Sequence, residues 1–205
     1  MRYLFLFCLL LSSFQSLSQP ERSRKSFLVC GDHFVHLVDY QNSKDTIPKI
    51  TWTWDAHQAE DLPDEFRLRK FNSVDDCKAI NGGKELLVSS SGGAVAVVEL
   101  ETSKVLFYAV VPNAHSVEIL PGNLLVAAAS TNRAGNKLMV FDLDDPEKIL
   151  FTDSLYSAHG VVWIKNRNSL FALGYDVLRE YKLKKAGALV LEKDWKIPGI
   201  SGHAP

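Results

Sequence analysis

The sequence predicts an all-β protein, a β-propeller with four-stranded antiparallel blades. Short apolar runs, rich in β-branched and aromatic side chains, alternate with turns that contain glycine, proline or asparagine. No stretch has a convincing 3.6-residue period, which argues against helices. A histidine after a small residue recurs at even spacing, as His115, His159 and His203, each 44 residues from the next. Repeats of this length are typical of propeller blades.

The apolar runs group into units of four strands. The unit that starts at His115 contains the expected strands 116–120, 123–129, 137–142 and 148–153. The next unit repeats them at 161–164, 169–174, 177–183 and 188–197. These patterns predict one propeller domain over residues 27–205, with blades at 27–60, 77–112, 115–155 and 159–198 and the start of a further blade at 202.

About four blades are fewer than the six or seven that single-chain propellers commonly have. A repeat array without a closing element leaves an open edge that other chains can pair with. We therefore expect this chain to be a fragment of a longer propeller, and to self-associate if it is complete.

The N-terminus is predicted to be a targeting segment. Residues 1–18 combine a basic start, a short apolar run and the small residues Ser16 and Ser18 before an expected cleavage site, as in a secretory signal peptide. Residues 19–26 then form a polar tether. A lipoprotein signal is the less favoured alternative, since Cys8 lies inside the apolar run. The mature protein is expected to be secreted or periplasmic, with no membrane span after cleavage.

Composition and motifs exclude several function classes. The net charge of −1 and the lack of a basic stripe with interleaved aromatics argue against nucleic-acid binding. The sequence has no nucleophile elbow, phosphate-binding loop, dinucleotide fingerprint or paired-cysteine metal motif. These observations leave ligand binding, polysaccharide chemistry and protein interaction as the classes to test.

Two cysteines remain after signal cleavage, Cys30 and Cys77. In an oxidising compartment they could form a disulfide. They could equally be two small buried residues in strands. The sequence leaves both interpretations open.

The evenly spaced histidines are the first candidate site. The first strand of each blade lines the channel of a propeller, so His115, His159 and His203 are expected at the channel mouth. By counting residues between repeats, their counterpart one blade earlier is Cys77, or Asp76 with a slip of one residue. Lys78 and Glu118 are nearby in sequence. Such a ring could bind a polar ligand or a divalent metal ion, or supply a general acid or base. The alternative is an architectural histidine that makes hydrogen bonds between blades.

The charged loop 57–74 is the second candidate site. Its Arg67 and Arg69 could hold a carboxylate or sulfate through paired hydrogen bonds. A solvated, salt-bridged loop is the favoured alternative. Trp52 and Trp54, on one face of an expected strand, are interpreted as core or edge packing rather than as a sugar-stacking platform.

Several stretches resemble an uncharacterised family, a domain of unknown function found in secreted propeller-like proteins, mainly from Bacteroidota. The resemblance covers residues 27–183, and its most specific parts are the motifs Asn113-Ala114-His115-Ser116 and Ser157-Ala158-His159-Gly160. It implies a six-bladed propeller of which this chain lacks the last blades. It implies no activity.

These observations favour a secreted or periplasmic propeller that binds a glycan or other polar ligand at the channel mouth through His115, His159, His203, Asp76, Lys78, Arg67 and Arg69. One alternative is a polysaccharide lyase or glycosidase that acts on acidic sugars, with His115 and His159 as catalytic candidates and His115, His159 and His203 as candidate ligands of a divalent metal. This rests on fold analogy alone. A protein-interaction scaffold is the other alternative.

Overall fold

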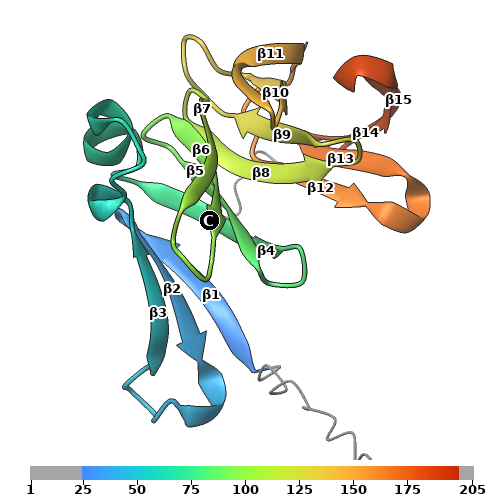
Figure 1. Cartoon of the computed structure of the whole chain (residues 1–205). Coiled ribbons are helices and arrows are strands. Elements are labelled where there is room, and N and C mark those ends of the chain that lie inside the picture. The colour runs from blue at the N-terminus through green and yellow to red at the C-terminus, as the bar shows by residue number, and fades with distance from the viewer. Residues whose placement is uncertain (1–24, 199–205) are drawn as a thin grey trace, which may run out of the picture.

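The protein folds as an all-β, propeller-like array of four antiparallel sheets, as the sequence predicts (Figure 1). The computed structural model describes residues 25–198. Signal peptide 1–18, most of tether 19–26, His203 and the blade predicted from residue 202 lie outside the described residues. Among the residues described, no helix is long and apolar enough to cross a membrane.

The first sheet has three strands, in the order β1-β2-β3, and each of the other three has four strands in chain order. The first comprises β1 (Ser26–Gly31), β2 (Phe34–Asp39) and β3 (Ile50–Asp55). The second comprises β4 (Val74–Ile80), β5 (Glu85–Ser90), β6 (Ala94–Glu99) and β7 (Val105–Val110). The third comprises β8 (Ala114–Leu120), β9 (Leu124–Ala129), β10 (Lys137–Asp142) and β11 (Asp145–Ser154). The fourth comprises β12 (Gly160–Ile164), β13 (Ser169–Leu173), β14 (Val177–Leu183) and β15 (Leu189–Lys196).

The core consists of three apolar layers, one between each pair of neighbouring sheets. Successive residues of a strand point to opposite faces. On β5, Leu86 and Val88 therefore pack toward the first sheet, while Leu87 packs toward the third. On β9, Leu125 and Val126 divide in the same way between the second and fourth sheets. Because these strands are buried on both faces, their sequences are continuous apolar runs rather than alternating ones.

The three strands of the first sheet correspond to the second, third and fourth strands of the other sheets. In the second sheet, the β5–β6 turn accepts a hydrogen bond at Gly93 O from Val111 N, just after β7 (3.1 Å). In the third sheet, Asn136 O accepts from Leu155 N (2.9 Å) at the same point. In the first sheet, the matching bond runs from Ala56 N, just after β3, to His33 O, in the β1–β2 turn (3.0 Å).

A groove lies between the first sheet and the second, beside β1 and β4. This groove has a volume of about 540 Å³ and is lined mainly by apolar and small residues of β1, β4 and the turn after β4, among them Leu28, Cys77, Ala79 and Gly82. Within residues 25–198, β2 is the strand that pairs with β1, so the other edge of β1 has no strand partner there.

The connection from β3 to β4 is ordered by local contacts. It contains a 3₁₀ turn, η2 (Ala56–Gln58), and a π-helical turn, η3 (Phe66–Lys70). Leu62 and Phe71 are buried, and Asp61 Oδ2 accepts a hydrogen bond from Val105 N at the start of β7 (2.6 Å). Trp54, the last aromatic residue of β3, is buried and packs edge-on against Phe71 (5.7 Å). This packing agrees with the interpretation of Trp54 as a core residue.

A polar contact also joins the third and fourth sheets. The hydroxyl of Tyr181 on β14 donates to Asp153 Oδ2 on β11 (2.6 Å), and Arg179 donates to Ser154 O (2.7 Å). Burial and the bond to Asp153 raise the pKa of the Tyr181 hydroxyl well above its usual value, which keeps it protonated as a donor.

Candidate functional site

The first strands of three consecutive sheets meet around the ammonium group of Lys78. From β4, Lys78 Nζ donates to Val161 O on β12 (2.8 Å), and to Val117 O and Ser116 Oγ on β8 (both 3.0 Å). An ammonium group has three N–H bonds, and three acceptors lie within hydrogen-bond distance. Lys78, predicted as a ligand-binding residue, therefore links β4, β8 and β12.

Two carboxylates balance the charge of Lys78. Asp76 Oδ2 lies 3.5 Å from Lys78 Nζ and accepts a hydrogen bond from Ser116 Oγ (3.1 Å). Glu118 Oε2 lies 3.9 Å from the same ammonium, and Glu118 Oε1 accepts from Ile119 N (3.0 Å). The sequence set Lys78 and Glu118 near Asp76, and the structure adds Ser116 to the same polar cluster.

A pocket of about 380 Å³ opens where these three strands end. Glu118 lines it from β8, Trp163 from β12, and Lys165 from the turn that follows β12. The turn after β4 forms a further wall with Asn81 and its glycines. Trp163 also packs against the apolar layer between the third and fourth sheets, so it is held in place while lining the pocket. We call this hollow the strand-end pocket.

His115 and His159 lie side by side near the starts of β8 and β12. Their rings are stacked, with centroids 4.3 Å apart and planes inclined by 25°. His115 Nε2 contacts Asn113 Oδ1 (3.2 Å), while His159 Nδ1 contacts Ser130 Oγ (3.0 Å) and Ser157 O (3.2 Å). Asn113 and Ser157, each two residues before a histidine, both have a left-handed backbone (φ 50° and 49°). The repeated turn thus delivers both rings to one place.

The counterpart of His115 in the second sheet is Asp75, and the predictions of Asp76 or Cys77 were wrong. The first strand is bulged between Val74 and Asp76 in β4, and between Ala114 and Ser116 in β8. The bulged residues are therefore Asp75 and His115. Counting failed because the turn between β4 and β5 is one residue longer than the turn between β8 and β9, and because it aligned β5 with β9 one residue out of register.

Arg67 and Arg69 lie on η3, away from the strand-end pocket. Arg67 donates from Nε and Nη2 to Asp64 Oδ1 (2.9 and 2.8 Å), and from Nη1 to His57 O (3.0 Å). This guanidinium is thus engaged within its own loop, as the alternative of a salt-bridged loop requires. Arg69 is exposed.

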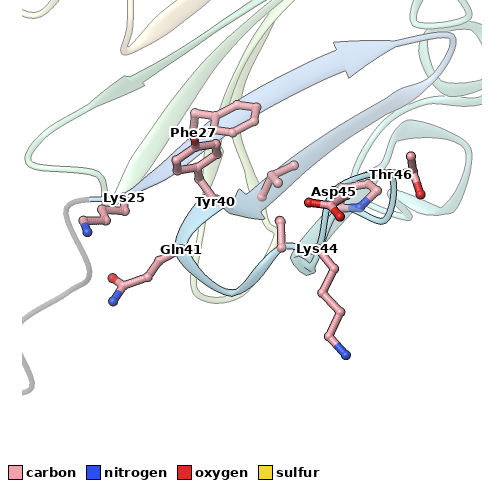
Figure 2. A pocket seen from close by; sticks show the side chains of 10 residues that line it. Lys25, Phe27, Tyr40, Gln41, Lys44, Asp45 and Thr46 are labelled. Atoms are coloured by element: carbon pink, nitrogen blue, oxygen red, sulfur yellow. The ribbon is translucent and has the colours of Figure 1, made fainter.

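A larger cavity lies at the far end of the first sheet. It has a volume of about 590 Å³ and includes the neighbouring rings of Phe27 and Tyr40. In Figure 2 the side chains of Gln41 and Lys44 point outward rather than toward each other. Because these two polar side chains do not converge, the strand-end pocket is the better candidate site.

Cys30 and Cys77 face each other from neighbouring strands, β1 and β4, as free thiols. A hydrogen bond to Cys77 lowers the pKa of Cys30, while the same bond and burial raise the pKa of Cys77. Both interpretations made from the sequence stay open: the residues are partly buried, and each thiol shifts the pKa of the other.

Sequence reasoning missed Trp163, Lys165 and Asn81, because these residues meet only when three turns are placed in space. It also missed His33, Asp55 and His57, which lie together at one end of the first sheet. An aspartate two residues before a histidine, in the motif Asp55-Ala56-His57, was a usable signal for this second group.

Comparison with known proteins identifies the family. A family model matches residues 28–182. The chain belongs to DUF6528, a family of unknown function. No curated protein matches this DUF6528 chain. A solved structure described as the mitotic checkpoint complex contains a similar WD40 propeller-like chain, with a TM-score of 0.60 and 13% identity.

That similarity covers 81% of the DUF6528 chain and 48% of the other chain, so our chain spans about half the length of this neighbour. At this level of identity the likeness concerns the fold alone. It supports the propeller-like arrangement of the four sheets.

Proposed function

We propose that this DUF6528 chain is the ligand-binding part of a secreted or periplasmic propeller, and that it binds a glycan in the strand-end pocket. The observation that carries the proposal is the set of groups lining that pocket: one indole, one carboxylate, one ammonium and one amide, supplied by three neighbouring sheets. Its volume of about 380 Å³ falls in the range of small-molecule sites.

Each lining group has a role in sugar recognition. The indole of Trp163 offers an apolar face on which a pyranose ring can stack. The carboxylate of Glu118 can accept hydrogen bonds from hydroxyl groups, and the amide of Asn81 can both accept and donate them. Lys165 is exposed at the start of its turn and can pair with an acidic sugar. The expected secretion rests on the predicted signal peptide, and a glycan is a ligand that such a compartment supplies.

The rigid surroundings support binding in a preformed site. Glu118 lies within reach of Lys78, whose ammonium is held by β8 and β12. The pocket wall therefore rests on strands rather than on long loops, which lowers the entropy cost of ordering it.

The proposal is tested by calorimetric titration of the purified protein with neutral and uronic-acid oligosaccharides. We expect Glu118→Gln and Lys165→Ala each to weaken binding by about tenfold, since each removes one charge-assisted contact. Arg69→Ala, an exposed change outside the pocket, serves as the matched control and should bind as the wild type does.

Suppose that Glu118→Gln and Lys165→Ala bind as the wild type does. Loss of binding in Arg69→Ala would then place the site in the charged loop, and loss in a His115→Ala/His159→Ala variant would place it at the histidine pair. Monitoring the same mixtures for new reducing ends or unsaturated products tests the lyase or glycosidase alternative.

A further inference from the structure

Two histidines and two aspartates gather at the end of the first sheet, outside the strand-end pocket. His33 lies in the β1–β2 turn, Asp55 ends β3, and His57 follows in η2. Strand pairing sets Asp55 opposite Phe34, next to His33, and Ala56 N donates to His33 O (3.0 Å). Backbone bonds thus fix the spacing of the three side chains.

The potential ligand atoms of these residues converge. One atom from each of His33, Asp55 and His57 lies within 4.8 Å of the other two, and His33 Nε2 is 3.8 Å from Asp55 Oδ1. In a tetrahedral zinc site, ligand atoms are about 3.3 Å apart. The two rings are stacked almost parallel (3.8 Å, 4°), so binding an ion requires them to tilt toward a common point.

Asp32 orients His33 by contacting the ring nitrogen that does not face Asp55. Its Oδ1 lies 3.3 Å from His33 Nδ1, on the side opposite Asp55. A neutral imidazole can donate to only one carboxylate. If Nδ1–H donates to Asp32, the lone pair of Nε2 faces the Asp55 carboxylate 3.8 Å away, an arrangement that a cation between them would stabilise. A carboxylate behind a histidine ligand is a recurrent feature of metal sites.

His57 supplies an independent sign of an absent partner. Its Nε2 is buried, and no hydrogen-bond partner for it occurs among residues 25–198. Buried polar atoms are nearly always paired with protein, water or an ion. His57 N donates to Asp55 Oδ1 (2.9 Å), so the backbone of this residue is already fixed while its ring nitrogen is not satisfied.

We propose that His33, Asp55 and His57 bind one divalent transition-metal ion, with Asp32 as the positioning residue. Two imidazoles and one carboxylate suit zinc and its neighbours in the first transition row. Three protein ligands leave a coordination position for water or a ligand atom. This site is separate from the strand-end pocket and from the His115–His159 pair.

The test uses purified, metal-stripped protein that carries no histidine tag. Zinc chloride is titrated into it by calorimetry, and cobalt chloride is titrated into it while the visible absorption is recorded. We expect one zinc ion per chain with a Kd in the micromolar range or below, and imidazole-bound cobalt bands. Asp55→Asn and His57→Ala should each weaken zinc binding by about 100-fold or more. Asp32→Asn should weaken it by about tenfold.

Asp55→Asn guards against a folding artefact, because asparagine can still accept the capping bond from His57 N. His36→Ala is the matched control, as His36 lies in the same sheet and bonds to Thr53 instead (2.9 Å). Each of three results would overturn the proposal. These are no zinc binding by the wild type, zinc binding retained in both His57→Ala and a folded Asp55→Asn, and zinc binding lost only in His115→Ala/His159→Ala.

Discussion

Replacing Lys78 with methionine is expected to lower the free energy of unfolding by about 2–3 kcal/mol. The change removes the donor for Val117 O and Val161 O, and it leaves the carboxylates of Asp76 and Glu118 without their shared cation. Because the Lys78 side chain is 29% exposed, water reduces the cost below that of a fully buried pair. Urea unfolding at neutral pH measures the difference.

Two further variants sharpen this prediction. Lys104→Met, which removes an exposed lysine from the β6–β7 turn, should change stability by less than about 0.5 kcal/mol. Adding Glu118→Gln to Lys78→Met should recover part of the loss, because it removes one uncompensated carboxylate. A Lys78→Met protein as stable as the wild type would show that this ammonium does not join the three sheets.

Oxidation of Cys30 and Cys77 is expected to stabilise the protein by about 2–4 kcal/mol. Cys30 has the lowered pKa, so its thiolate attacks oxidised glutathione and releases one reduced glutathione. Cys77 then attacks the mixed disulfide, giving the Cys30–Cys77 bond and a second reduced glutathione. The bond would tie β1 to β4, and hence the first sheet to the second, across a long stretch of chain.

The measurement is urea unfolding with oxidised glutathione or with reductant, after peptide mass spectrometry has identified the bond. A Cys8→Ser background leaves two cysteines, and Cys30→Ser in that background is the matched control, whose stability should not respond to oxidant. Disulfide-linked dimers, or no bond at all under oxidised glutathione, would contradict the expected pairing.

The elements that sequence reasoning predicted best are those that packing determines locally. The second strands of the sheets, such as β5 and β9, are buried on both faces, so their apolar runs are unambiguous. The repeated turn before His115 and His159 indicated that these two rings occupy related positions, and they are in fact stacked.

Other features depend on geometry that residue counts do not contain. A longer turn and a misaligned second strand made Asp75, rather than Asp76 or Cys77, the counterpart of His115. The first sheet resembled a blade of its own, although its strands match the second to fourth strands of the others. Lys78 bonds to backbone carbonyls of two other sheets, and a carbonyl group leaves no mark in the sequence.

The most direct test of the proposed glycan site uses the side chains of the four tryptophans. Their indole N–H signals can be followed by NMR while the ¹⁵N-labelled protein is titrated with an oligogalacturonate and, separately, with a neutral oligosaccharide. If a glycan binds in the strand-end pocket, the signal of Trp163 shifts with saturation, while those of Trp52, Trp54 and Trp195 stay in place. A binding isotherm carried by Trp52 or Trp54, or saturation without any change at Trp163, would contradict the assignment of this pocket as the ligand site.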